Sequence, residues 1–282
     1  MKRLFLLTVF ILLSAFVIPK KEITWVAIGD SITYHNGKPW ATRNRLTHGY
    51  MDDVVEKLPY IHFTNQGYGG WTAKTMADNI EKIGITKADI YTILLGTNDW
   101  WTGLPIGILD DYSNNTGNGT VYGAYRTIIN KLRSLNSNAN IILLTPMQRT
   151  DFVDVNDSTS IIYGCYKANK TGHFLSEYAD VIKNIAKTEN FKLVDLYYKS
   201  GITVQNAVKF RRLKDPKTGE YKNCTYPQYV GMPYNPGADD YPYPLDAIDM
   251  TYDGLHPSDK GHKVIADMLV KVMRKLTVTP EK

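Results

Sequence analysis

Cysteine and histidine are scarce in this chain of 282 residues, which contains 2 of the first and 6 of the second. Cys165 and Cys224 belong to no CxxC pair and the histidines form no cluster with ligand spacing, so the sequence predicts no metal site and no cofactor. In an exported chain the two cysteines can form a disulfide, and two separate buried thiols are the alternative. The sequence leaves both open.

The excess of positive charge is also small. The net charge of +5 at pH 7 is spread along the chain, and the basic residues form no nucleic-acid-binding motif with aromatic platforms, so no nucleic-acid partner is expected. One basic run could recruit an acidic polysaccharide, although a solvated face is the preferred interpretation. It consists of Lys209, Arg211, Arg212, Lys214, Lys217 and Lys222.

Long apolar runs are missing except near the first residues. The run from Leu4 to Ile18 follows Lys2 and Arg3 and is shorter than a comfortable membrane span. These features predict a secretory signal over residues 1–20, export to the periplasm or the extracellular space, and no stable membrane span after its removal. An uncleaved N-terminal anchor is the alternative, because small residues are rare around the expected cleavage site.

No linker or repeat divides the remainder, so residues 21–282 are predicted to form one domain. Strand-like and helical patterns alternate along it, which is typical of an α/β fold with three layers and a central parallel five-stranded sheet. The flavodoxin-like strand order places the first strand between the second and the third. The expected strands are Ile23–Ile28, Ile61–Thr64, Ile90–Leu95, Ile141–Thr145 and Phe191–Leu196. The expected helices between them are Tyr50–Leu58, Ala73–Ile80, Val121–Leu135 and Phe174–Lys187.

Ser31 directly follows the first expected strand, and the block Asp253-Gly254-Leu255-His256 lies near the other end of the chain. A hydrolase can use such groups as a nucleophilic hydroxyl, a proton-accepting imidazole and a carboxylate that orients the imidazole. One turn of irregular backbone can bring Asp253 against one nitrogen of His256 and leave the other nitrogen facing Ser31. Ser258 is the expected cap of a final amphipathic helix, and His262 is expected on the surface of that helix.

Two further polar blocks follow the second and third expected strands. Asn65–Gly70 and Gly96–Asp99 offer hydrogen-bond donors for a developing oxyanion. Since the carboxyl ends of parallel strands share one edge, these blocks and Ser31 are expected to meet there. Each block alone is compatible with an ordinary turn or helix cap. Such turns do not explain why four blocks occur in this order at strand ends.

This order of blocks resembles the SGNH hydrolases, also called the GDSL esterases and lipases, over nearly the whole chain after the leader. The resemblance implies that Ser31 is the nucleophile, His256 the base and Asp253 its orienter. It also implies an oxyanion hole formed by the Ser31 N–H, the Gly67 N–H and the Asn98 side chain. The first block reads Gly-Asp-Ser-Ile where the family motif has Gly-Asp-Ser-Leu, which exchanges one apolar residue for another.

An aromatic-rich insertion, residues 201–251, is too long for a plain connection and directly precedes the block with the expected base. Folded over the catalytic edge, it could offer tyrosine rings to a sugar, with Trp71, Trp100 and Trp101 of the oxyanion loops as further substrate contacts. The alternative is that these aromatic residues pack the insertion against the body of the protein.

Export, an aromatic rim and the lack of a lid-like apolar stripe predict a secreted serine esterase that acts on a carbohydrate. We expect it to remove acyl groups, with acetyl as the favoured one, through an acyl-enzyme. The expected partner is an acylated glycan or another small ester. A lysophospholipase, thioesterase or short-chain lipid esterase is the alternative, because the same triad serves those substrates. A non-catalytic carbohydrate-binding relic is disfavoured, since nucleophile, base and orienter are all present.

Overall fold

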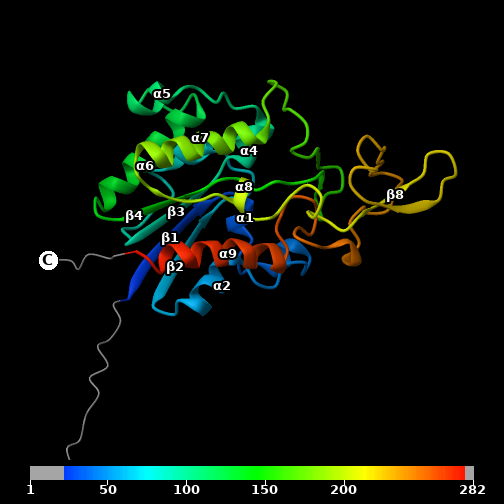
Figure 1. The fold of residues 1–282 in the computed structure, drawn as a ribbon, viewed down its shortest axis with the longest axis horizontal. Coiled ribbons are helices and arrows are strands. Elements are labelled where there is room, and N and C mark those ends of the chain that lie inside the picture. The colour runs from blue at the N-terminus through cyan, green and yellow to red at the C-terminus, as the bar shows by residue number, and fades with distance from the viewer. Residues whose placement is uncertain (1–21, 277–282) are drawn as a thin grey trace, which may run out of the picture.

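A parallel sheet of five strands lies at the centre of the fold (Figure 1). The computed structural model describes residues 22–276, so the expected signal over residues 1–20 falls outside the described part. Between residues 22 and 276, no helix combines the length and the apolar character needed to cross a membrane.

The strand order is β2-β1-β3-β4-β7, and all neighbouring pairs are parallel. This confirms the flavodoxin-like arrangement with the first strand between the second and the third. The inner strands are almost wholly buried, which explains why their sequences are nearly continuous apolar runs. The strands are β1 (Ile23–Gly29), β2 (Ile61–Gly67), β3 (Ile90–Leu94), β4 (Asn140–Leu144) and β7 (Lys192–Val194).

β7 is shorter than the sequence predicted. The expected strand ran from Phe191 to Leu196, but the chain leaves the sheet after Val194. The side chain of Asp195 accepts a hydrogen bond from the Tyr198 N–H and so caps the short helix α8 (Leu196–Lys199). A helix cap therefore ends the strand two residues early.

Helices cover both faces of the sheet and complete the predicted three layers (Figure 1). One face packs against α2 (Tyr50–Lys57) and α9 (Asp259–Met273) in a single apolar cluster. The opposite face packs against three helices in the larger apolar cluster. These are α3 (Ala73–Asn79), α6 (Val121–Leu135) and α7 (Leu175–Thr188), and the short α5 (Leu109–Ser113) lies beyond them.

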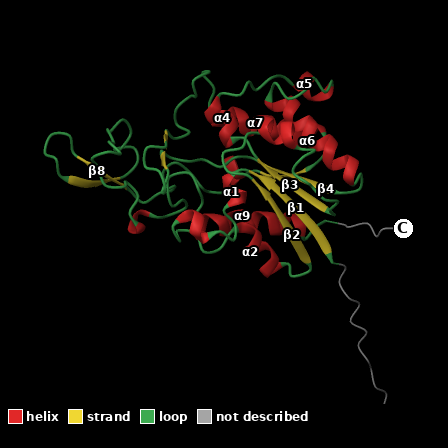
Figure 2. Ribbon diagram, turned by 180° about the vertical axis from the view of Figure 1, so that it is seen from behind, coloured by secondary structure: helices red, strands yellow, loops and turns green. Residues whose placement is uncertain are grey.

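The chain also forms a smaller lobe, which both views place at the far end of the molecule from β2 (Figure 2). It contains two antiparallel hairpins, one before α7 and one within residues 201–251. The hairpins are β5 (Phe152–Val153) with β6 (Ile161–Ile162), and β8 (Arg211–Lys214) with β9 (Tyr221–Cys224), and the turn η2 (Leu245–Ala247) follows.

The aromatic residues of the insertion point inward and pack it against residues 150–153, in line with the alternative interpretation. The hydroxyl of Tyr229 shares a hydrogen bond of 2.6 Å with Thr150, and the hydroxyl of Tyr241 donates to the carbonyl of Val153 at 2.8 Å. None of the insertion tyrosines singled out from the sequence is exposed. They are Tyr221, Tyr226, Tyr229, Tyr234, Tyr241 and Tyr243.

Arg211 corrects the interpretation of the basic run as a solvated face. Its side chain is buried and its guanidinium lies 2.5 Å from the Asp151 carboxylate. Cys165 and Cys224 are both free, which decides the open choice against a disulfide. Cys165 is buried in the main core cluster, whereas Cys224 is half-buried at the end of β9.

The expectation that His262 lies on the surface is wrong. The side chain is 1% exposed, its Nδ1 accepts the Tyr50 N–H at 3.1 Å, and its ring stacks on that tyrosine. The reason is its helical position, because His262 lies on the same face of α9 as Ile265 and Leu269, and this face packs against α2. Burial lowers the pKa of His262 to about 3.

Candidate active site

Ser31 lies where β1 ends and the short helix α1 (Ser31–Tyr34) begins. The preceding residue, Asp30, caps this helix, because its side chain accepts the Ile32 N–H at 3.0 Å. Burial raises the pKa of Asp30 to about 6. The strand therefore delivers the serine hydroxyl to the carboxyl edge of the sheet, and the cap fixes its direction.

The structure brings Ser31, His256 and Asp253 together although 225 positions separate the first two. His256 Nε2 lies 2.8 Å from Ser31 Oγ, and its Nδ1 lies 2.7 Å from Asp253 Oδ2. The other carboxylate oxygen of Asp253 accepts the backbone N–H groups of Leu255 at 3.0 Å and His256 at 2.7 Å. Those bonds leave Oδ2 for the imidazole alone, as an orienting carboxylate requires.

The electrostatics of His256 favour proton uptake. Burial by itself lowers the pKa of this imidazole, but the charge of Asp253 and its hydrogen bond act in the opposite direction, and the pKa ends above its ordinary value. The Nδ1–H donates to the carboxylate in this arrangement. The Nε2 nitrogen is then the acceptor that faces the serine hydroxyl.

Three aromatic side chains enclose the His256 ring. Phe152 meets it edge-on with 5.3 Å between ring centroids, Tyr252 stacks on it at 5.7 Å, and His35 tilts against it at 4.8 Å. Burial, followed by the charge of His256, lowers the pKa of His35 to about 3. His35 is therefore a neutral wall of the site, and only His256 of this pair is tuned to take a proton near neutral pH.

The loop that carries the base is held from the lobe. The Thr150 N–H donates to the carbonyl of Gly254 at 3.0 Å, and the Val153 N–H donates to the carbonyl of Asp253 at 3.2 Å. Gly254 has a φ of +91°, and a Cβ at this position would meet the Asp151 carbonyl oxygen at 1.9 Å. Only glycine can therefore bring the loop this close to the backbone of Asp151.

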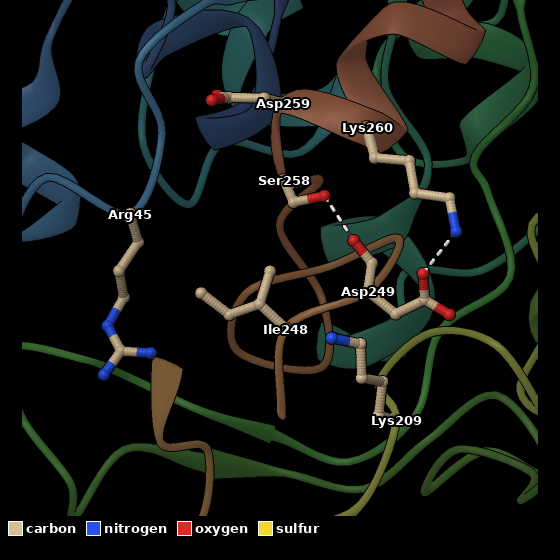
Figure 3. A pocket seen from close by; sticks show the side chains of 7 residues that line it. All are labelled: Arg45, Lys209, Ile248, Asp249, Ser258, Asp259 and Lys260. Carbon is tan, nitrogen blue, oxygen red and sulfur yellow. Dashed lines mark hydrogen bonds and ion pairs between the residues drawn. The ribbon is translucent and has the colours of Figure 1, made fainter. Parts of the chain in front are cut away.

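The ends of the same loop meet at a pocket of about 420 Å³ that shares no lining residue with the pocket at Ser31 (Figure 3). The Ser258 hydroxyl donates to the Asp249 carbonyl, and Lys260 pairs with the Asp249 carboxylate at 2.5 Å. Ser258 Oγ also accepts the Gly261 N–H, which confirms Ser258 as the cap of α9. These contacts close the loop at its base, so the triad is supported from both sides.

Gly67 is not where the family resemblance placed it. Its N–H donates to the Asn65 side chain at 2.9 Å, and a Cβ here would meet the Tyr34 nitrogen at 2.3 Å, so Gly67 packs against α1. Gly69 and Gly70 line the pocket at Ser31 instead. Among the hydrogen bonds found for residues 22–276, none uses the N–H of Ser31 or Gly70. The structure therefore offers these two N–H groups to an oxyanion.

Asn98 completes this donor set from α4 (Thr97–Thr102), which begins after β3. Its amide nitrogen donates one hydrogen to the Trp71 carbonyl at 3.0 Å and retains a second hydrogen for a ligand. The next residue, Asp99, is buried and accepts the Ala73 N–H at 2.8 Å. Burial raises the pKa of Asp99 to about 7. The bond between Asp99 and Ala73 thereby joins α4 to α3 next to the Asn98 side chain.

A pocket of about 420 Å³ opens above Ser31. Of the three expected tryptophans, only Trp101 lines it. Trp100 is fully buried, where its indole N–H donates to the His173 carbonyl at 3.1 Å, and Trp71 stacks on Tyr68 outside the lining. The lining consists of Ser31, His35, Gly69, Gly70, Asn98, Trp101, Thr102, Phe152, Asp154, Ser160, Ile162, Leu255 and His256.

The sequence did not predict which residues line the lobe side of this pocket. It consists of Phe152, Asp154, Ser160 and Ile162, all on the β5–β6 hairpin, and the insertion 201–251 contributes nothing to the lining. The available signal was the long stretch between β4 and α7, which contains polar turn residues and no helical pattern.

Three side chains with metal-ligating atoms cluster elsewhere, near the start of α2. His48, Asp53 and Glu56 place their ligand atoms within 4.8 Å of one another around the start of α2. None of the three lines the pocket at Ser31.

The comparisons with known proteins agree with this geometry. The model of the GDSL-like lipase/acylhydrolase family matches residues 27–264. A possible lipase from Chitinophaga pinensis is 49% identical and superposes with a TM-score of 0.90, with 92% of this chain and all of the other covered. The comparison with curated proteins gave no match.

Two more distant solved structures share the fold. A protein from Lactobacillus plantarum is 20% identical with a TM-score of 0.61, over 92% of this chain and 99% of that one. An acetyl-xylooligosaccharide esterase from Geobacillus is 19% identical with a TM-score of 0.50, over 93% and 98%. With the family model covering most of its length, the chain belongs to the GDSL-like lipase/acylhydrolase family.

Proposed function

We propose that this protein is an exported serine esterase that hydrolyses short acyl esters on a carbohydrate, with acetyl as the preferred acyl group. The observation that carries the proposal is the continuous pair of contacts from Ser31 Oγ through His256 to Asp253, at 2.8 and 2.7 Å, on the floor of a pocket. A hydroxyl bonded to an oriented, buried imidazole is an activated nucleophile.

In the proposed first step, His256 Nε2 removes the Ser31 proton while Oγ forms a bond to the ester carbonyl carbon. The carbonyl oxygen becomes an oxyanion that the N–H groups of Ser31 and Gly70 and the amide of Asn98 stabilise. The imidazolium then gives its proton to the leaving alcohol as the ester C–O bond breaks. Ser31 now carries the acyl group, and Asp253 keeps the base in position throughout.

In the second step, water takes the place of the alcohol. His256 removes a proton from the water as its oxygen attacks the acyl-enzyme, and the proton returns to Ser31 Oγ when the acid departs. The two steps together convert an ester and water into an acid and an alcohol. The same three donors hold the second oxyanion.

The pocket supports a polar alcohol as the leaving group. Its lining places Trp101 and Phe152, which offer flat apolar faces, beside the polar side chains of Thr102, Asp154 and Ser160. Flat faces combined with hydrogen-bonding groups suit a sugar ring. The acetyl-xylooligosaccharide esterase from Geobacillus shares only the fold with this chain.

Export rests on the leader over residues 1–20, and N-terminal sequencing of the protein from culture fractions tests it.

Replacing the nucleophile gives the decisive test. We expect Ser31→Ala to lower kcat on p-nitrophenyl acetate by about 10⁴- to 10⁶-fold and to abolish labelling by a fluorophosphonate. Ser134→Ala is the matched control, because this serine is exposed on α6 and its hydroxyl bonds only its own helix. Labelling that persists in the Ser31 variant would overturn the assignment, and a wild-type protein that never labels would indicate a binding relic.

A substrate panel separates the esterase alternatives. We expect release of acetate from acetylated xylan to exceed hydrolysis of octanoyl esters, because the pocket mixes polar and apolar groups along its walls. A preference for acyl chains of eight carbons or more would favour the lysophospholipase or thioesterase alternative and remove the carbohydrate part of the proposal.

A further inference from the structure

The two sides of the pocket face different parts of an ester. Ser31, Gly70 and Asn98 surround the carbonyl oxygen, whereas His256 must lie next to the leaving alcohol in order to protonate it. Phe152 meets the His256 ring edge-on at 5.3 Å. Groups that line the pocket beside Phe152 therefore face the alcohol.

Asp154 is such a group. Asp154 directly follows β5, its N–H continues the hairpin by donating to the Ser160 carbonyl at 3.0 Å, and Phe152 and Asp154 both line the pocket. Val153 points the other way, into a small apolar cluster with Val208 and Tyr243. The charge of Asp154 also contributes to the raised pKa of His256, which agrees with their proximity.

The carboxylate of Asp154 is held in place and only partly used. Its Oδ1 accepts the N–H groups of Asn156 at 2.6 Å and Asp157 at 3.1 Å. No hydrogen bond to its Oδ2 is found among residues 22–276. The pocket lining includes no lysine or arginine, so nothing on its walls neutralises this charge.

We propose that Asp154 determines which alcohols the enzyme accepts. Its free carboxylate oxygen accepts a hydrogen bond from a sugar hydroxyl next to the ester, and its charge repels alcohols that carry a carboxylate or a phosphate. The preferred substrates are thus acyl esters of neutral sugars rather than of uronates or phospholipid head groups. This inference rests on the proposed esterase function and specifies its substrate class.

The test compares Asp154→Asn with Asp157→Asn. The first keeps the shape and one acceptor oxygen for the turn but removes the charge. The control changes an exposed carboxylate of the same loop, which bonds only Thr159 and does not line the pocket. Three esters are used: p-nitrophenyl acetate, an acetylated methyl xyloside and an acetylated methyl galacturonoside.

For Asp154→Asn we expect kcat/KM on the xyloside to fall by about 10- to 100-fold, mainly through KM, because one charge-assisted hydrogen bond is lost. The ratio of galacturonoside to xyloside activity should rise at least tenfold. The loss on p-nitrophenyl acetate, whose alcohol carries no sugar hydroxyl, should be smaller than the loss on the xyloside when both are measured on the pH plateau, and a wild-type midpoint of urea unfolding shows that the variant folds. Asp157→Asn should leave all three unchanged.

A second readout reports the position of the charge. The charged groups that raise the pKa of His256 include Asp253, Asp30 and Asp154, and the titratable side chains of His35, Tyr252 and His262 also face or act on its ring. Removing the charge of Asp154 should move the acid limb of kcat/KM to lower pH, and Asp157→Asn should not.

The inference is overturned if Asp154→Asn leaves both the substrate ratio and the acid limb as in the wild type. It also fails if the wild type hydrolyses p-nitrophenyl acetate but neither sugar ester, although the esterase function then stands. Loss of all Ser31-dependent activity on every ester would instead refute the proposed function itself.

Discussion

The two walls of the pocket are built in different ways. The sheet wall carries Ser31, Gly70 and Asn98, each a few residues after the end of β1, β2 or β3, so the strand order alone brings them together. The lobe wall carries Phe152 and Asp154 and depends on contacts between segments far apart in the sequence. The sheet thus positions the nucleophile and the proposed oxyanion donors, whereas the lobe supplies the second wall of the pocket and holds the loop that carries His256.

Asp151 is the centre of the contacts that hold the lobe wall. One carboxylate oxygen pairs with Arg211 at 2.5 Å, and the other accepts the Gly164 N–H at 2.8 Å and the Tyr166 hydroxyl. Its carbonyl accepts the hydroxyl of Tyr243. The insertion 201–251 thus reaches the active site indirectly, by fixing the strand that bears Phe152.

The largest effect on stability is expected from breaking this ion pair. Arg211→Ala leaves the partly buried Asp151 carboxylate without its cation, and we expect a loss of about 3–5 kcal/mol in the free energy of unfolding, measured in urea. Arg212→Ala is the matched control, because the adjacent arginine is exposed on the other side of β8 and should cost about 0.5 kcal/mol or less.

The same measurement examines whether the walls are independent. If Arg211→Ala lowers the m-value and gives a separate early transition, the lobe unfolds before the sheet, as the comparison implies. Equal unfolding curves for the two arginine variants would show that the ion pair does not hold the lobe.

The sheet wall is examined by removing its side-chain donor. We expect Asn98→Ala to lower kcat on p-nitrophenyl acetate by about 10²- to 10³-fold with little change in KM, because the donor acts on charge that develops in the transition state. Asn223→Ala serves as the control, since this asparagine is exposed on β9 and does not line the pocket. An effect on KM alone would place Asn98 in substrate binding instead.

The corrected glycine assignment gives a smaller effect on stability. A Cβ on Gly67 would meet the backbone nitrogen of Tyr34 at 2.3 Å, whereas a Cβ on Gly70 would meet nothing within 4 Å. We therefore expect Gly67→Ala to destabilise the protein by about 1–3 kcal/mol or more through overpacking. Gly70→Ala should cost about 1 kcal/mol for its φ of +73°. Equal melting temperatures for the two variants would contradict this.

The sequence predicted the sheet wall well because that wall is local. Alternating strands and helices imply the strand order, and residues just after strands must then share an edge. The triad residues come together as the motifs indicated. Gly67 was misplaced because a glycine-rich turn does not reveal which N–H is already used, and here the Asn65 side chain takes that of Gly67.

The lobe wall could not be predicted in the same way. Two-residue strands such as β5 and β6 carry no periodic pattern, and the partner of Asp151 lies 60 positions along the chain. The tyrosines of the insertion suggested a substrate rim, but the hydroxyls of Tyr241 and Tyr243 bond the backbone carbonyls of Val153 and Asp151. Trp100 was mistaken for a substrate contact because its neighbour Trp101 faces the pocket and a helix turns consecutive residues to different sides.

The smallest expected effect concerns pH, where both walls act on one group. The pKa of His256 lies above its ordinary value and the neutral imidazole is the active form, so kcat/KM should rise with pH and reach half its maximum above pH about 6.5. His35 does not contribute, since its pKa is about 3. Asp30, with a pKa of about 6, does titrate nearby.

Asp30→Asn separates these two groups, because the amide oxygen can still accept the Ile32 N–H and cap α1. If His256 is the base, the acid limb persists in this variant and moves to lower pH, since the charge of Asp30 helps to raise the pKa of His256. A limb that disappears on this substitution would identify Asp30 as the titrating group, and the sheet wall alone would then set the pH dependence.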